Sequence, residues 1–329
     1  MVGCIGSQGG DGTLGTAPVS VRNGGLGATE LLPDRFIRVA LVVLVLAVPA
    51  LAHLPEGDVI AAFQFPDLLV PTIDGDLSDW EAFPEEYALQ TDDFVDLVND
   101  ASVDPADLSV RLMVGWNQLR NKIYVAARVI DDIHQVDRPA GTASSRIFQD
   151  DDLEVFVDAD HSGGQYANFA ELSPEEQLQV NGATANHFVL AGPSPDEDYF
   201  VNFSAAAWYA QPDGKHTAAA IGFTDDGKTT VTTYELMLTP FDVIDMNAAI
   251  LSTEHQLVAE EILGFNVEFG DFDANSLLMD AKWSLSGGQN AFRTADRFND
   301  MVLKPLEGLF EPTGIEARSW GRIKAALGR

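Results

Sequence analysis

The chain has 329 residues, and 46% of them are hydrophobic, which is enough for a sizeable core. Its 51 acidic and 19 basic residues give a formal charge of −32. Nucleic acid and an anionic membrane surface both require clustered Lys and Arg, so this acidic balance disfavours both as partners. A single cysteine, Cys4, also excludes a disulfide within the chain.

A secretory signal peptide is predicted before residue 53. Arg35 and Arg38 flank the start of an apolar run, Phe36–Ala52, whose end has the small-x-small form of a cleavage site. The run is short for a membrane span, although an uncleaved anchor is the alternative. We therefore expect residues 1–52 to be an N-terminal extension with its signal. The protein is then secreted, periplasmic or at the cell surface.

His53–Leu69 is predicted to be a linker leading into a strand, and a turn signal follows at Asp74-Gly75. Trp80, just after this turn, is expected to be a buried anchor, with ligand stacking as the alternative. Leu108–Trp116 alternates between apolar and polar residues, and Lys122–Asp132 does so again. The two segments are predicted to pair as a hairpin.

The strand at the centre of the chain is predicted within Ile147–Asp160, which reads IFQDDDLEVFVDAD. Side chains alternate between the two faces of a strand. One face should carry Leu153, Val155 and Val157, and the other Glu154, Phe156 and Asp158.

The remaining segments predict further short strands and little helix. A capped helix is expected at Ser173–Val180 and helical structure at Glu254–Glu261. Further strands are expected at His187–Leu190, Tyr199–Tyr209, Thr229–Leu238, Ile262–Asp273, Ala281–Leu285 and Met301–Leu303. About ten short strands with turns between them predict an all-β protein, an antiparallel β-sandwich with short helices in its loops.

Carboxylates gather where three of these strands begin or end. The candidate ligands are Asp131, Asp132, Asp151, Asp152, Asp271 and Asp273. Ca²⁺ takes six to eight oxygen ligands, so a structural calcium site is expected at this edge. A solvated acidic rim is the alternative.

Six segments, in order, resemble the family 9 carbohydrate-binding modules. They are PTIDGDLSDW, KIYVAARVIDDIH, FQDDDLEVFVDAD, YELMLTPFDV, LGFNVEFGDFD and AKWSLSGGQNAFRTADRFNDMVL. The resemblance implies a sandwich of jelly-roll or immunoglobulin-like form over residues 53–306. It also implies a polysaccharide or oligosaccharide as partner, structural calcium and a monomer. Residues 307–329 are left as a basic tail.

The same resemblance implies where a sugar is bound. Phe148 and Phe292 stand where the family has two tryptophans that sandwich a sugar ring. Glu154, Glu268 and Gln289 stand at its polar contacts, while a family arginine falls near Val189. A phenylalanine can stack on the apolar face of a sugar but offers less area than tryptophan and no N–H donor.

Binding without cleavage, in the service of polysaccharide degradation, is therefore the predicted function. No motif selects a pair of catalytic carboxylates, so an enzyme is not expected; if there were an activity, it would be glycoside hydrolysis. Two alternatives remain open. One is a structural or surface-assembly protein that binds no sugar, and the other is a haem-binding relative using Met113, Met237 or His187.

Overall fold

The computed structural model describes residues 59–306 except 82, 100–103, 195, 205 and 274–277. The predicted signal segment and the basic tail lie outside the described residues. The strands are β1 (Val59–Gln64), β2 (Leu89–Gln90), β3 (Val95–Asp96), β4 (Leu108–Asn117), β5 (Lys122–Asp131), β6 (Asp152–Asp158), β7 (Asn186–Leu190), β8 (Phe200–Asn202), β9 (Thr217–Asp225), β10 (Thr230–Leu238), β11 (Phe241–Val243), β12 (Thr253–Glu254), β13 (Ile262–Asp271), β14 (Ala281–Ser284) and β15 (Asn299–Leu303).

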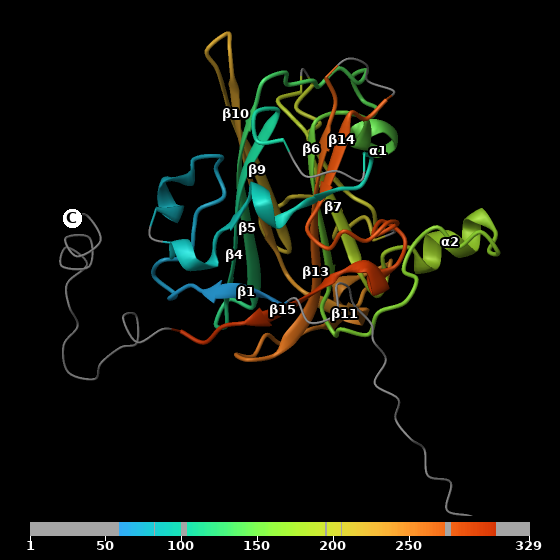
Figure 1. The fold of residues 1–329 in the computed structure, drawn as a ribbon. Coiled ribbons are helices and arrows are strands. Elements are labelled where there is room, and N and C mark those ends of the chain that lie inside the picture. Colours follow the sequence, from blue (N-terminus) through green and yellow to red (C-terminus); the bar gives the residue numbers. More distant parts are fainter. Residues whose placement is uncertain are drawn as a thin grey trace, which may run out of the picture. The chain divides into compact units, whose positions relative to one another are not determined.

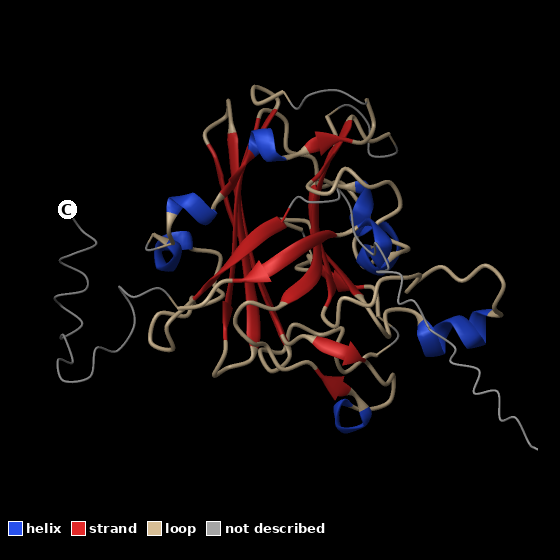
Figure 2. Cartoon of the chain, turned by 60° about the horizontal axis from the view of Figure 1, so that its bottom comes forward, coloured by secondary structure: helices blue, strands red, loops and turns tan. Residues whose placement is uncertain are grey.

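Helices are short and lie between the strands (Figure 2). Two are α-helical, α1 (Ala143–Arg146) and α2 (Pro174–Val180). The others are 3₁₀ turns: η1 (Leu77–Trp80), η2 (Glu85–Tyr87), η3 (Thr91–Asp93), η4 (Ile147–Gln149), η5 (Ala249–Leu251) and η6 (Ala295–Arg297). Over the described residues, none of these helices has the length and apolar character that crossing a membrane needs.

The strands are hydrogen-bonded in the order β8-β7-β6-β13-β15-β1-β4-β5-β10-β9, with β14 and β3 branching from β13, and β2 from β4. A separate pair is formed by β11 and β12. All pairs of named strands are antiparallel except the two made by β1, which runs parallel to both β15 and β4. The expected antiparallel arrangement is therefore correct except at β1.

The core lies between two groups of strands, which Figure 1 shows side by side. One group is β6, β7, β13 and β14, and the other is β4, β5, β9 and β10. Leu153 and Val155 of β6 belong to the same buried cluster as Val125 and Ala127 of β5. The inward face of β6 is therefore the one that the alternation predicted.

A second cluster covers the outer face of β4, β5 and β10. Trp80 is 1% exposed and packs edge-on against Phe65, with 5.2 Å between the ring centres. Its Nε1 donates to Glu235 of β10 at 2.8 Å. The prediction that Trp80 is a buried anchor is confirmed.

Two predicted elements differ from the structure. Glu254–Glu261 is not helical: Thr253–Glu254 forms β12, and the backbone N–H groups of His255 and Glu260 donate to Pro240 and Leu303 outside the segment. Of the expected strand Tyr199–Tyr209, only Phe200–Asn202 forms β8. The capped helix is confirmed as α2, where Ser173 Oγ accepts from Glu176 N.

Candidate functional site

One face of the group β6, β7, β13 and β14 is turned away from the core and carries polar groups. Glu154 on β6 lies directly opposite Glu268 on β13, and Ser284 on β14 lies opposite Glu268 on its other side. Residues directly opposite one another share a face of the sheet. The register therefore brings together two of the residues predicted from the sequence, Glu154 and Glu268.

A lysine joins the two carboxylates. Lys282 Nζ lies 2.6 Å from Glu154 Oε1 and 2.8 Å from Glu268 Oε2. His187 Nε2 is 2.6 Å from Glu154 Oε2, and Ser284 Oγ donates to Glu268 Oε1 at 3.2 Å. Both glutamates are 1% exposed, so this is a buried network in which every carboxylate oxygen has a donor.

The two glutamates differ in their electrostatics. Burial disfavours the charge on Glu154, but Lys282 and His187 outweigh burial and lower its pKa to about 2. At Glu268 burial dominates, so its pKa is raised in spite of Lys282. The pKa of Lys282 is raised because Glu154, Glu268 and Asp152 together outweigh the effect of burial. Lys282 and Glu154 therefore form the charged pair at neutral pH.

On one flank, aromatic rings lead from this network to the surface. Phe156 stacks on His187 with 4.3 Å between the ring centres. Phe203 lies 5.0 Å from His187 on the other side, and Phe148 lies 6.3 Å from Phe203. Phe148 is 40% exposed, so one of the two predicted stacking residues presents a ring to solvent.

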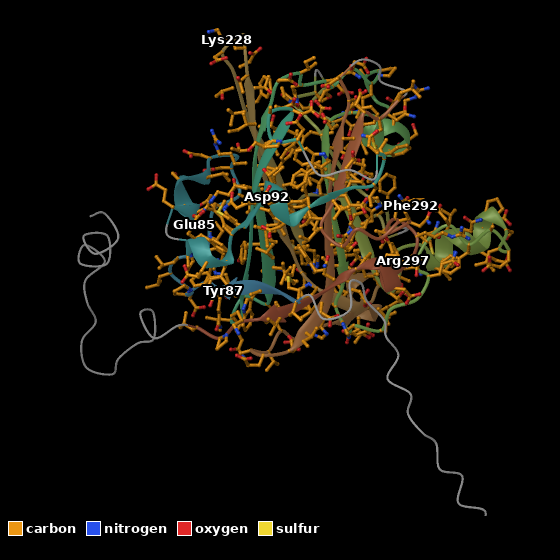
Figure 3. The ribbon with its side chains drawn as sticks, viewed as in Figure 1. Glu85, Tyr87, Asp92, Lys228, Phe292 and Arg297 are labelled. Atoms are coloured by element: carbon orange, nitrogen blue, oxygen red, sulfur yellow. The ribbon has the colours of Figure 1, made fainter. Side chains whose placement is uncertain are left out.

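Phe292, which lies in the loop between β14 and η6, is 42% exposed. The residue before it, Ala291, accepts a hydrogen bond from the buried Tyr166 Oη at 2.8 Å, which anchors this loop beneath Phe292. Figure 3 shows Phe292 and Arg297 on the same side of the strands as α2, away from Glu85. Phe148 thus comes from η4 and Phe292 from the loop after β14, and both reach the surface.

Gln289 and Val189 stand at the two other positions that the resemblance to the family singles out. Gln289 donates through Nε2 to the carbonyl oxygen of Leu97 at 2.9 Å. Val189 lies opposite Glu154 in the register and is buried against Ile147. An apolar side chain therefore stands where the resemblance implies an arginine.

Lys282 is the residue that sequence reasoning missed. The alternation in Ala281–Ser284 signals a strand, but only the register with β13 reveals that Lys282 shares a face with the glutamates. His187 was considered as a haem ligand beside Met113 and Met237. Both methionines are buried in the cluster around Trp80 and not beside His187, which bonds Glu154 instead.

The predicted calcium ligands gather mainly at the ends of β5 and β13. We call Asp107, Asp131, Asp132, Asp271 and Asp273 the outer acid group. Ligand oxygens of Asp131, Asp271 and Asp273 lie within 4.8 Å of one another, as do those of Asp107, Asp132 and Asp273. Asp107 had not been predicted, because it precedes β4 and is separated in the sequence from the ends of β5 and β13 that carry the other acids.

Carboxylates in this group repel one another. Burial first, and then neighbouring acids, raise the pKa of Asp271 to about 8 and that of Asp273 to about 6. Asp131 Oδ2, Asp271 Oδ2 and Asp273 Oδ1 are buried without a hydrogen-bond partner among the described residues. Unpartnered buried oxygens are costly, and a cation is the group that would satisfy them.

Next to this group is a small cavity of about 10 Å³ between the two groups of strands. We call it the inner cavity; its polar lining residues are Asp131, His134, Asp151 and Asp152. Its other lining residues are Leu108, Val129, Tyr234, Phe269 and Gly270. The predicted ligands Asp151 and Asp152 thus belong to this cavity and not to the outer acid group.

The described chain is therefore an all-β protein with a buried polar network on one sheet face and acidic groups at its strand ends. No protein-family model and no curated protein matches the chain. Among solved structures, it is similar to a family 9 carbohydrate-binding module from Caldicellulosiruptor kristjanssonii in complex with cellotriose. That match has 13% identity, covers 76% of this chain and 96% of that chain, and has a TM-score of 0.48.

The complex of a family 9 module from the same organism with glucose is similar too, with 13% identity and a TM-score of 0.49. It covers 76% of this chain and 98% of that chain.

Proposed function

We propose that the protein binds carbohydrate, without cleaving it, on the face formed by β6, β7, β13 and β14. The observation that carries this proposal is the pair of half-exposed rings, Phe148 and Phe292. Phe148 is linked to His187 of the network through Phe203, and Ala291, next to Phe292, shares a buried cluster with Phe156, which stacks on His187. A sugar has apolar faces and hydroxyl-bearing edges, so it needs aromatic surface together with charged hydrogen-bonding groups. The resemblance of the motifs to carbohydrate-binding modules supports the same ligand class.

Within the network, Lys282 is the group best placed to meet a hydroxyl. Its side chain is 17% exposed, whereas those of Glu154 and Glu268 are 2% exposed. The two glutamates hold the ammonium in place, and we infer that a sugar contacts Lys282 first. Such an arrangement suits a neutral sugar, because the charge of Lys282 is already compensated by Glu154.

We test this by calorimetry with soluble oligosaccharides, beginning with cellotriose and glucose, at saturating Ca²⁺. Phe148→Ala and Phe292→Ala should each weaken binding at least about fivefold, since stacking contributes roughly 1 kcal/mol or more. Phe223→Ala is the matched control, because Phe223 is 37% exposed but lies on β9. Binding unchanged in both site variants would contradict this site.

If a broad glycan array shows no ligand while the protein remains folded, the structural or surface-assembly alternative takes its place. The predicted signal within Phe36–Ala52 supports an exported protein in either case. A role in polysaccharide degradation follows if the ligand proves to be a plant or microbial polysaccharide.

We also propose that the outer acid group holds structural Ca²⁺. Ca²⁺ prefers carboxylate oxygens and accepts irregular geometry, which fits the convergence of Asp131, Asp271 and Asp273. The unpartnered oxygen atoms of these three residues support a cation there. A bound ion would relieve the repulsion that raises the pKa values of Asp271 and Asp273.

A further inference from the structure

One ring nitrogen of His134 is turned toward the inner cavity. The other, Nε2, lies 3.0 Å from the carbonyl oxygen of Gly192. A carbonyl only accepts hydrogen bonds, so Nε2 carries the proton and Nδ1 of a neutral ring has a lone pair. Nδ1 is 3.2 Å from Asp151 Oδ2 and 3.8 Å from Asp131 Oδ2. A lone pair facing two carboxylates is repulsive, so a cation must lie between them, either a proton or a metal ion.

A proton on Nδ1 would satisfy only part of this site. It can reach Asp151 Oδ2, but Asp131 Oδ2 and Asp152 Oδ2 are left buried without hydrogen-bond partners. Asp131 is 3% exposed and Asp152 is 2% exposed, so bulk water does not serve either oxygen. The cavity of about 10 Å³ beside them is close to the space that one water molecule or one ion occupies.

The geometry matches that of ligands around one small ion. Metal–ligand bonds of about 2.1 Å place neighbouring ligand atoms roughly 3.0 to 3.4 Å apart at angles of 90° to 109°. The distance from His134 Nδ1 to Asp151 Oδ2 lies in this range, and the distance to Asp131 Oδ2 is slightly longer. The bond from Nε2 to the Gly192 carbonyl is the kind of support that orients metal-binding histidines.

We propose that the inner cavity is a site for a divalent transition-metal ion, Mn²⁺ or Zn²⁺, held by His134 Nδ1, Asp131 and Asp151. The imidazole nitrogen distinguishes this site from the all-oxygen outer acid group, because nitrogen ligands suit transition metals and Ca²⁺ prefers oxygen. Asp152 lies beside the ion and Asp131 belongs to both groups. The proposal does not depend on sugar binding.

The test uses the protein from His53 onward, freed of metal by chelation and then saturated with Ca²⁺. Mn²⁺ is titrated in, and pulsed electron paramagnetic resonance measures nitrogen coupling to the bound ion. We expect one equivalent of Mn²⁺ coupled to a single imidazole nitrogen. His134→Gln should remove the nitrogen coupling and weaken Mn²⁺ binding by at least about 10- to 100-fold.

His255→Gln is the matched control, because His255 also lies between two carboxylates, Asp242 and Glu261, but away from the cavity. It should leave both the coupling and the affinity unchanged. Thermal melting in Ca²⁺ shows whether His134→Gln is folded. If this variant does not fold, the nitrogen coupling to Mn²⁺ in the wild-type protein and in His255→Gln tests the proposal.

Three outcomes would overturn the proposal. The first is no Mn²⁺ binding beyond the Ca²⁺ sites, in which case His134 holds a proton and the cavity holds water. The second is bound Mn²⁺ without nitrogen coupling. The third is coupling that disappears in His255→Gln.

Discussion

At the scale of single residues, the polar face depends on Lys282. Its ammonium is the cation between the buried Glu154 and Glu268. Removing one member of a buried ionic network leaves uncompensated charge and costs about 3–5 kcal/mol. We therefore expect Lys282→Met to lower the free energy of unfolding by that amount, as measured by urea denaturation.

Lys228 provides the control for this substitution. It lies at the tip of the β9–β10 hairpin (Figure 3), outside the strands that carry the network, and it is exposed. Lys228→Met should change the free energy of unfolding by less than about 0.5 kcal/mol. Equal effects of the two substitutions would mean that the network contributes nothing beyond the loss of one lysine.

Glu235 is a second buried carboxylate with a structural role. It accepts from Trp80 Nε1 at 2.8 Å and from the backbone N–H groups of Asp74 and Gly75 at 2.9 and 2.6 Å. Glu235→Gln keeps the shape but turns one acceptor into a donor. We expect a loss of about 1.5–3 kcal/mol in the free energy of unfolding.

The loss should involve Trp80 itself. A double-mutant cycle with Trp80→Phe, which removes the indole N–H, measures the coupling between the two side chains. Additive effects would show that the hydrogen bond from Trp80 to Glu235 does not contribute.

At the scale of elements, the ends of β5 and β13 bring acids together, and a pH dependence follows. Without a cation, the folded-state pKa values of Asp271 and Asp273 are raised to about 8 and about 6. An acid whose pKa is raised by folding stabilises the fold below its unfolded pKa of about 3.9, and this stability is lost as the pH rises. The melting temperature of the chelated protein should therefore fall between about pH 4 and pH 8.

Ca²⁺ should reverse this trend. It binds the ionised carboxylates. The melting temperature in excess Ca²⁺ should therefore rise with pH or stay level over the same range. Asp273→Asn should flatten the pH dependence of the chelated protein and reduce the effect of Ca²⁺. A melting temperature that does not respond to chelation at pH 8 would contradict a calcium site in the outer acid group.

At the scale of the whole molecule, β1 joins the two groups of strands, because it pairs with β15 on one side and β4 on the other. It also buries Ala62 and Phe63. A chain beginning at Phe65 should therefore fail to fold, since β15 and β4 would each lose the neighbour that joins the two groups of strands. A chain beginning at His53, which lacks only the predicted extension and signal, should melt cooperatively like the longer chain.

Circular dichroism of the two truncated chains is the measurement. Folding of the shorter chain with unchanged stability would show that β1 is dispensable. If the chain beginning at His53 failed to fold, residues before His53 would belong to the folded unit.

The sequence by itself determined the type of fold and the two faces of its central strand. Period-two alternation is a local property, so Leu153, Val155 and Val157 could be assigned to the core without knowing what they pack against. Trp80 was predicted to be buried because a large aromatic residue after a tight turn can fix the turn by packing into the core. The predicted grouping of Glu154 with Glu268 rested on the family resemblance. In the structure, the pairing register of β6 with β13 places the two residues opposite one another.

Only the tertiary structure decided which polar groups meet. Lys282 and His187 are far from Glu154 in the chain, and the strand register that joins them depends on long-range pairing. Asp151 likewise joins Asp131 and His134, which are neighbours in the chain, only through the tertiary structure. The parallel pairing of β1 could not be predicted either, because alternation shows which face of a strand is buried but not the direction of the neighbouring strand.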